Sequence, residues 1–271
     1  MKLNNRVAVL TGAGSGIGRA LALSLARRGC HLALADINER RLAQTAQMTG
    51  QFGIRTTQHV LDVASRTSVA DLPQAVVHAH GHVDLLINNA GVALGGSFEQ
   101  VSEANFDWLM AVNFDGVVRM TRAFLPLLLA RQQARIVNVS SLFGLIAPPG
   151  HVAYCASKFA VRGFSNALRH ELAGTPVGIT VVHPGGVATA IAQDARVPGG
   201  LPKDEVEQGR ANFEKLLRMP PHKAAEIILH GVEADRARVL VGLDAVITSW
   251  LERLLPVSYW KLIGKAAPTE I

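Results

Sequence analysis

The sequence predicts an α/β fold, with one parallel β-sheet of about seven strands and helices on both faces. Three observations support this prediction. Short runs of apolar and β-branched residues alternate with longer amphipathic runs from end to end. The 271 residues suffice for a large core, and the 49% hydrophobic and 18% charged fractions are typical of globular proteins. Neither an internal repeat nor a low-complexity tract interrupts the alternation.

Seven segments are predicted to be strands. They cover residues 7–10, 31–35, 55–60, 83–87, 135–139, 179–182 and 239–241. Helical patterns follow at about 17–28, from about 38, and at about 154–173. Strands that alternate with helices form a doubly wound, Rossmann-like parallel sheet. Because ligands bind such sheets at the carboxyl ends of the strands, the residues that follow each strand are the candidates for a site.

We expect residues 1–271 to form a single domain. A stretch at about 190–220, rich in Gly, Pro and charge, is predicted to be a mobile insertion. An apolar tail at about 243–271 has the pattern of a helix followed by aromatics and lysines. Three alternatives stay open for the tail: it covers the ligand pocket, packs on a partner subunit, or docks peripherally on a membrane surface.

Charge and cysteine content narrow the class of partner. The net charge is +6, from 27 basic and 21 acidic residues, but the basic residues are scattered, which argues against nucleic-acid binding. An anionic cofactor or a membrane surface explains the charge more simply. The two cysteines, Cys30 and Cys155, form neither a disulfide framework nor a metal cluster, so we expect a reducing compartment, the cytoplasm, and no metal.

A glycine-rich loop follows the first predicted strand. Its sequence is Thr11-Gly12-Ala13-Gly14-Ser15-Gly16-Ile17-Gly18. Glycines allow a tight turn and let phosphate oxygens approach the backbone amides, and the next helix directs its positive end toward a pyrophosphate. Asp36 ends the second strand, close to the offset of about 20 residues at which an acid binds a ribose 2′-hydroxyl. Its charge would repel a 2′-phosphate, so NAD is favoured over NADP, although Arg40 and Arg41 could soften that preference.

Tyr154 and Lys158 lie four residues apart on a predicted helix and therefore share one face. A free phenol, with a pKa of about 10, is a poor base at neutral pH. A neighbouring ammonium and an oxidised nicotinamide ring both favour the phenolate and lower that pKa. Such a tyrosine can take a proton from an alcohol as hydride leaves it, or give one to a ketone.

Taken together, these motifs resemble the short-chain dehydrogenase/reductase family, in its shorter-chain form. The matching residues, in family order, are Thr11-Gly12-x-x-x-Gly16-x-Gly18, Asn88-Asn89-Ala90-Gly91, Asn113, Ser140-Ser141, Tyr154-x-x-x-Lys158 and Pro184-Gly185. They span roughly the first 190 residues. The resemblance implies an oxidoreductase that acts on alcohols or ketones, usually as a dimer or tetramer.

The resemblance also assigns roles to single residues. Tyr154 is the general acid/base, Ser141 binds the substrate oxygen, Lys158 binds the nicotinamide ribose, and Asn113 holds a water that relays protons. The cofactor contacts implied are Gly12, Gly14, Ser15, Gly16, Ile17, Gly18, Asp36, Asp62, Val63, Asn89, Ala90, Gly91, Tyr154, Lys158, Pro184, Gly185, Val187 and Thr189. Ser15 stands where NADP-preferring members often carry a basic residue, which agrees with Asp36.

Structural explanations remain open for several of these residues. The glycines could form a simple strand–helix turn, and Tyr154 and Lys158 a surface pair. Ser141 could merely end a strand, Asn88 and Asn89 could only form a turn, and Asn113 could distort a helix without a relay role. Helix or turn caps are the alternatives for Asp36, Asp62 and Thr189.

The loops that the resemblance assigns to the substrate are almost entirely apolar. They carry Val92, Ala93, Leu94, Leu142, Phe143, Leu145, Ile146, Pro148, Pro149, Val187 and Ile191. A buried charged substrate would need paired basic groups, and His151 is the one basic side chain in these loops. We therefore predict a hydrophobic secondary alcohol or ketone as substrate, and a loop role for His151. The alternatives are an NADP(H)-dependent carbonyl reductase and a non-catalytic, cofactor-binding regulator on the same fold.

Overall fold

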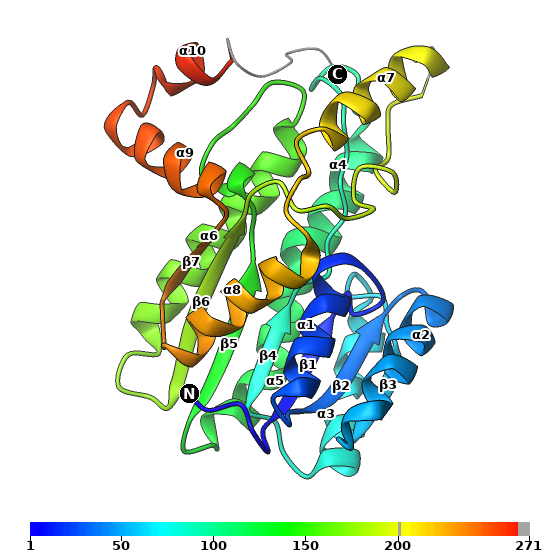
Figure 1. Cartoon of the computed structure of the whole chain (residues 1–271), viewed down its shortest axis with the longest axis vertical. Helices are drawn as coiled ribbons and strands as arrows, with labels where there is room; N and C mark the ends of the chain where they lie inside the picture. Colours follow the sequence, from blue (N-terminus) through cyan, green and yellow to red (C-terminus); the bar gives the residue numbers. More distant parts are fainter. Residues whose placement is uncertain (200–201, 265–271) are drawn as a thin grey trace.

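A computed structural model of the chain describes residues 1–199 and 202–264 (Figure 1). The described residues form a seven-stranded, entirely parallel sheet in the order β3-β2-β1-β4-β5-β6-β7. The strands are β1 (Val7–Thr11), β2 (His31–Asp36), β3 (Thr56–Val60), β4 (Leu85–Asn88), β5 (Ala134–Val139), β6 (Val177–Pro184) and β7 (Arg238–Val241). The predicted fold class is therefore confirmed.

Helices cover both faces of the sheet because the central strands are apolar on both sides. In β1, Ala8 and Leu10 belong to the core under α1, α2 and α8, whereas Val9 belongs to the core under α3 and α5. The longer helices are α1 (Gly16–Arg27), α2 (Glu39–Thr49), α3 (Arg66–His80), α4 (Glu103–Met110), α5 (Gly116–Leu129), α6 (Val152–Glu171), α7 (Lys203–Glu214), α8 (Pro221–Glu233), α9 (Leu243–Leu254) and α10 (Tyr259–Ile263). Shorter turns are η1 (Gly50–Phe52), the π-helical η2 (Ala111–Asp115) and η3 (Leu142–Gly144).

The strand order reverses between β1 and β4, so the chain leaves these two neighbouring strands in opposite directions. Such a point opens a crevice at the carboxyl ends of the strands. Figure 1 shows α7, α9 and α10 gathered at that end of the sheet, away from the N-terminus. The elements that depart from the regular alternation therefore lie at the end of the sheet where the crevice opens.

Element boundaries differ from the prediction by a few residues. The helix that carries Tyr154 begins at Val152, and β6 extends from Val177 through Pro184. The predicted insertion at 190–220 contains α7, and the apolar tail forms α9 and α10. Residues 200–201 of the insertion and 265–271 of the tail lie outside the described residues.

Candidate active site

The loop between β1 and α1 brings its backbone against two neighbouring segments. Gly12 and Gly16 have φ angles of +65° and +51°, which residues with a Cβ rarely adopt. A Cβ on Gly12 would lie 2.8 Å from Cα of Ala90, and one on Gly16 would lie 2.9 Å from Cγ2 of Thr189. Ser15 precedes α1 and makes no side-chain hydrogen bond to its first turn. More than a simple turn, this loop is a close-packed junction at a helix N-terminus.

Within the same loop, the other glycine-motif residues have local roles. The side chain of Ile17 packs against the core on the α1 face of the sheet. Gly18 is buried, and a Cβ there would collide with the carbonyl oxygen of Gly12. The resemblance assigned both residues to the cofactor, and the structure gives each of them a packing role as well.

Asp36 lies at the end of β2 and binds the glycine loop directly. Its Oδ2 accepts a hydrogen bond of 2.8 Å from the Gly14 amide, and its Oδ1 accepts one of 2.8 Å from the Asn38 amide. The residue that caps α2 is Asn38, whose side chain accepts from the amide of Arg41. The alternative that Asp36 is a helix N-cap is therefore wrong.

The end of β4 is fastened to the glycine loop through Asn89. Its Nδ2 donates to the carbonyl oxygens of Thr11 and Gly12, at 3.0 Å and 3.1 Å. In return, Oγ1 of Thr11 accepts from the amides of Asn89 and Ala90. Asn88 is the buried last residue of β4. Neither asparagine is merely a turn residue.

Asp62 and Val63 follow β3 on the far side of the crevice. Oδ1 of Asp62 accepts a hydrogen bond of 2.8 Å from the Ala64 amide, so Asp62 does cap a turn. The cap of α3 is Ser65. Val63 packs against Gly116, where a Cβ would lie 2.8 Å from its Cγ2. The structure thus supports a structural role for both residues and leaves their assignment to the adenine as a prediction.

Tyr154 and Lys158 share one face of α6, as their spacing predicts. The Lys158 Nζ lies 5.6 Å from the centroid of the Tyr154 ring. Lys158 is buried, with 4% of its surface exposed, and its ammonium donates to the carbonyl oxygen of Val139 at 3.2 Å. The surface-pair alternative is therefore wrong for these two residues.

The pKa values of this pair differ from the simplest expectation. Burial raises the pKa of Tyr154 to about 12, and a hydrogen bond with Ser141 offsets part of that rise. Burial also lowers the pKa of Lys158 to about 8. The protein's own groups thus hold Tyr154 in its protonated form, and the expected lowering by the Lys158 ammonium does not dominate.

Two serines after β5 have separate tasks. Ser141 begins η3, where its Oγ accepts from the Phe143 amide at 3.1 Å, and its side chain lowers the pKa of Tyr154. Ser140 is buried, and its hydroxyl donates to the backbone carbonyl of Lys158 at 2.9 Å. Ser141 therefore meets the phenol, whereas Ser140 fixes α6 against the sheet.

Asn113 lies in η2, a π-helical turn between α4 and α5, with its side chain fully buried. Its Oδ1 accepts from the Val92 amide at 2.8 Å, and its Nδ2 donates to Val92 and to Oγ of Ser157. A Cβ on Gly91 would lie 3.2 Å from the Asn113 Oδ1 and 3.3 Å from the Lys158 Nζ. The asparagine and the lysine therefore converge on the same glycine.

The segment after β6 covers the glycine loop. Its first residues are anchored, because Asp244 accepts from the Gly186 amide at 2.7 Å and packs against Gly185. Val187 is buried and pairs with Met219. Thr189 precedes the next helix, α7, by a long loop, so the alternative that it caps that helix is wrong.

A cluster of rings adjoins Tyr154. The Phe143 centroid lies 6.0 Å from that of Tyr154, 5.1 Å from His151 and 6.4 Å from Phe213 of α7. Burial lowers the pKa of His151 to about 4, so this histidine is neutral at pH 7. Four other residues of the predicted substrate loops, Leu94, Leu145, Ile146 and Val187, are buried in the protein.

Sequence reasoning missed two residues that hold the site together. Ser157 donates to the Tyr154 carbonyl and accepts from Asn113, so it links α6 to η2. His183 is fully buried, with Nδ1 at 3.0 Å from the Ser141 carbonyl oxygen, to which it must donate. Both are polar residues in otherwise apolar patterns, which was the one signal available.

Residues 1–199 and 202–264 contain no group of three or more His, Cys, Asp or Glu side chains arranged for a metal ion. Among the helices that the structure describes, none is long and apolar enough to cross a membrane.

Known proteins are similar to this chain in sequence and in fold. The short chain dehydrogenase family model matches residues 6–198. The chain is 45% identical over 263 residues to the putative oxidoreductase SadH of Mycobacterium tuberculosis, covering 96% of this chain and 94% of that protein. It is 31% identical to the dehydrogenase/reductase SDR family protein 7-like of Anopheles gambiae, covering 98% and 84%.

Among solved structures, a short-chain dehydrogenase/reductase from Burkholderia phymatum in complex with NAD superposes with a TM-score of 0.87 at 31% identity, covering 94% of this chain and 95% of that one. The motifs, the sheet order and these similarities agree. The chain belongs to the short-chain dehydrogenase/reductase family and is an NAD(P)-dependent oxidoreductase.

Proposed function

We propose that the protein transfers a hydride between NAD(H) and a hydrophobic secondary alcohol or ketone, with Tyr154 as the general acid/base. The observation that supports this most directly is the convergence at the end of the sheet. The Ser141 side chain acts on the Tyr154 phenol, whose pKa it lowers, and Lys158 is buried beside the Tyr154 ring. A phenol, a hydroxyl and a buried ammonium together can bind and protonate a carbonyl oxygen.

The glycine loop fits a dinucleotide. Gly12 and Gly16 take left-handed backbone conformations, and a Cβ at either would fill the space against Ala90 or Thr189. The first turn of α1 has no side-chain cap from Ser15, so its amides can bind a pyrophosphate. When bound, the nicotinamide accepts or donates the hydride.

The protein's own residues would then manage the proton. In reduction, the Tyr154 hydroxyl gives its proton to the substrate oxygen, while the Ser141 hydroxyl donates a hydrogen bond that stabilises the charge developing there. The Lys158 ammonium would hold the nicotinamide ribose. The Asn113 side chain shapes the turn at Gly91, beside the lysine, where a water could carry protons to solvent. In oxidation, the same proton returns from the alcohol to Tyr154.

We propose NAD rather than NADP as the working cofactor. Asp36 directs its carboxylate at the Gly14 amide, where a ribose 2′-hydroxyl could donate to it and a 2′-phosphate would be repelled. The related Burkholderia phymatum protein was solved with NAD, which supports the same choice. Asp62, Val63, Pro184, Gly185, Val187 and Thr189 stay proposed cofactor contacts.

The ring cluster supports an apolar substrate. Phe143 stands next to Tyr154, and Phe213 packs against Phe143 and His151. Because His151 is neutral, no ionised side chain of the cluster offers a partner to a charged substrate. We expect flat or bulky apolar alcohols to be better substrates than small hydroxy acids.

We further propose that the chain forms a single catalytic domain. We also propose that the protein works in the cytoplasm as a homodimer or homotetramer. The family commonly assembles through the helices that hold Asn113 and Tyr154. Peripheral membrane contact through the tail stays one of its three proposed roles. Size-exclusion chromatography with light scattering tests the assembly, and co-sedimentation with liposomes, before and after deletion from Leu243, tests the membrane contact.

A panel of hydrophobic secondary alcohols, followed by NADH absorbance, tests the proposed reaction. The matched variant is Tyr154→Phe, which keeps the ring and removes the transferable proton. We expect it to bind NADH as the wild type does and to lose roughly 10²–10⁴-fold in turnover.

Three results would contradict the proposal in different ways. Turnover of small charged hydroxy acids alone would overturn the substrate class. Preference for NADPH would favour a carbonyl reductase. NADH binding without turnover of any alcohol or ketone would favour a cofactor-binding regulator.

A further inference from the structure

The side chain of Arg41 starts next to Asp36, whose carboxylate is proposed to bind the ribose. A Cβ on Gly14 would lie 2.9 Å from Oδ2 of Asp36 and 3.0 Å from Cβ of Arg41, so the three residues meet at one point. The backbone of Arg41 is fixed there, because its amide donates to Asn38 and its carbonyl accepts from Arg19. A phosphate on the ribose 2′-oxygen would therefore come within reach of the Arg41 guanidinium.

That guanidinium is already paired with an acid from a distant part of the chain. Its Nη1 lies 2.9 Å from Oδ2 of Asp194, in the segment between β6 and α7. The pairing raises the pKa of Arg41, with a smaller contribution from the charge of Asp36. The cation next to the ribose position is thus neutralised by a residue that belongs to neither the glycine loop nor α2.

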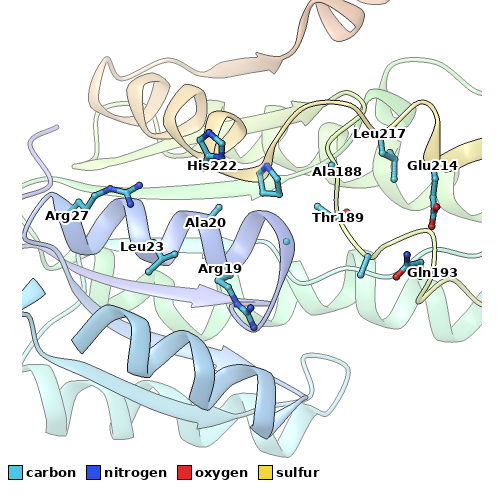
Figure 2. Close-up of a pocket in the computed structure, with 13 residues that line it drawn as sticks. Arg19, Ala20, Leu23, Arg27, Ala188, Thr189, Gln193, Glu214, Leu217 and His222 are labelled. Atoms are coloured by element: carbon cyan, nitrogen blue, oxygen red, sulfur yellow. The ribbon is translucent and has the colours of Figure 1, made fainter. Parts of the chain in front are cut away.

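The segment that carries Asp194 runs from the glycine loop to the loop after β4, and Arg210 of α7 donates to the carbonyl oxygen of its Ala195 at 3.1 Å. At one end Thr189 touches Gly16, and at the other the amide and carbonyl of Arg196 bond to the loop after β4. Between them the segment borders a hollow of about 630 Å³ on the flank of α1, in which Figure 2 shows Gln193 and Thr189 across from Arg19. The ion pair with Arg41 therefore fixes the middle of this segment to α2.

Resting on the proposed use of a nicotinamide dinucleotide, we infer that Asp194 is a specificity-determining residue: by occupying Arg41, it denies a 2′-phosphate its cationic partner and reinforces the preference for NAD that Asp36 sets. The chain would thus select its cofactor with two acids. One repels the phosphate, and the other removes the cation that could compensate for the repulsion.

The size of the effect follows from the exposure of the pair. The side chains of Arg41 and Asp194 are 43% and 52% exposed. Pairs exposed to this degree couple weakly, so releasing Arg41 should strengthen NADPH binding by about three- to fivefold relative to NADH. The gain should shrink at high ionic strength, because salt screens both the pair and the new contact.

The test measures dissociation constants of NADH and NADPH by nicotinamide fluorescence on the full chain. Asp194→Asn keeps the shape of the side chain and removes the negative charge that neutralises Arg41. Arg41→Gln breaks the same ion pair, and loosens the segment equally, but leaves no cation. We expect the NADPH-to-NADH affinity ratio to rise in Asp194→Asn, and to fall or stay unchanged in Arg41→Gln and in the double variant.

An unchanged ratio in Asp194→Asn, or an equal rise in Arg41→Gln, would overturn the inference while leaving the proposed function intact. Equal weakening of both dinucleotides in the two single variants would mean that the pair only holds the segment in place. If the wild type bound neither dinucleotide, the proposed function would fall as well.

Discussion

Lys158 is a cation almost without access to water, and this has a measurable cost. Burial lowers its pKa from 10.5 to about 8. Between these pH values the unfolded chain holds a proton that the folded chain has released, so this group's contribution to stability rises with pH from about 8 to about 10.5. Below about pH 8 the full penalty of the buried charge is present.

The variant Lys158→Met removes that penalty and its pH dependence. We expect the free energy of unfolding of the wild type, relative to Lys158→Met, to rise by on the order of 3 kcal/mol from about pH 7.5 to about pH 10.5. Urea denaturation of both proteins across this range measures the difference. Parallel pH profiles would contradict a lysine that is buried and charged in the folded protein.

Single residues of the site were predictable where the chemistry requires a particular residue type at a particular spacing along the chain. Tyr154 and Lys158 are four apart on a helix, and the structure brings both to one face. Ser157 and His183 were not predictable, because their partners, Asn113 and the Ser141 carbonyl, lie on other elements. A hydrogen bond between distant segments leaves no periodic trace in the sequence.

Among the elements, the amino ends of three strands are joined by Asp84, which is fully buried. Its Oδ1 accepts from Arg6 before β1 and from Arg131 before β5, at 3.0 Å and 2.9 Å, and its Oδ2 accepts from the Val7 amide. Burial alone would raise the pKa of Asp84, but these hydrogen bonds outweigh it and lower the pKa below its usual value.

Asp84→Asn should destabilise the sheet because it leaves the arginines without a counter-charge. We expect a loss of about 2–4 kcal/mol in the free energy of unfolding at pH 7. Since the folded pKa is depressed, the carboxylate's contribution is present above about pH 4 and is lost as pH falls further. Chemical denaturation at pH 7 measures the loss.

The matched control is Asp115→Asn, which breaks a pair between Asp115 and Arg119 with a carboxylate that is 49% exposed. We expect it to change stability by less than about 0.5 kcal/mol. Equal effects of the two substitutions would contradict a special role for the buried carboxylate.

The helices and strands were predicted closely where one hydrophobic period dominates the sequence. All seven strands were predicted: six contain an apolar run, whereas β3, Thr-Thr-Gln-His-Val, is polar and was predicted from its place in the alternation. The start of α6 was missed, since Val152 and Ala153 before Tyr154 carry no cap of the Ser, Thr, Asp or Asn type. A helix distortion at Asn113 was one of the alternatives, but its π-helical form could not be predicted, because one extra residue per turn is a tertiary adjustment.

At the scale of the whole molecule, the site depends on segments far apart in the chain. The Arg41–Asp194 pair joins α2 to the segment after β6, and Asp244 of α9 accepts from the Gly186 amide after β6. The order of the motifs along the chain predicted that they meet at one end of the sheet. It could not predict these ties, because either partner alone is an ordinary surface charge.

The tail extends this dependence to the substrate loops. Its inner side is fixed at two points, where Asp244 binds Gly186 and where the Tyr259 hydroxyl accepts from the Ala147 amide at 2.9 Å. Ala147 lies in the loop that separates Ser141 from Tyr154 in the chain. The outer side of the tail is apolar and exposed. Its large exposed side chains include those of Leu243, Ile247, Trp250 and Leu254.

Of the three proposed roles for the tail, covering the pocket has a direct consequence for kinetics. Tyr259→Phe keeps the ring and removes the acceptor for the Ala147 amide, so the loop beside the ring cluster loses a tie. We expect the KM for apolar alcohols to rise about two- to tenfold, on the scale of one lost hydrogen bond, with kcat and NADH affinity nearly unchanged. Trp250→Ser, on the exposed outer side of α9, should leave the KM unchanged and serves as the control. The opposite pattern, a KM effect from Trp250→Ser alone, would mean that the outer side of the tail, and not its contact with the loop, governs substrate binding.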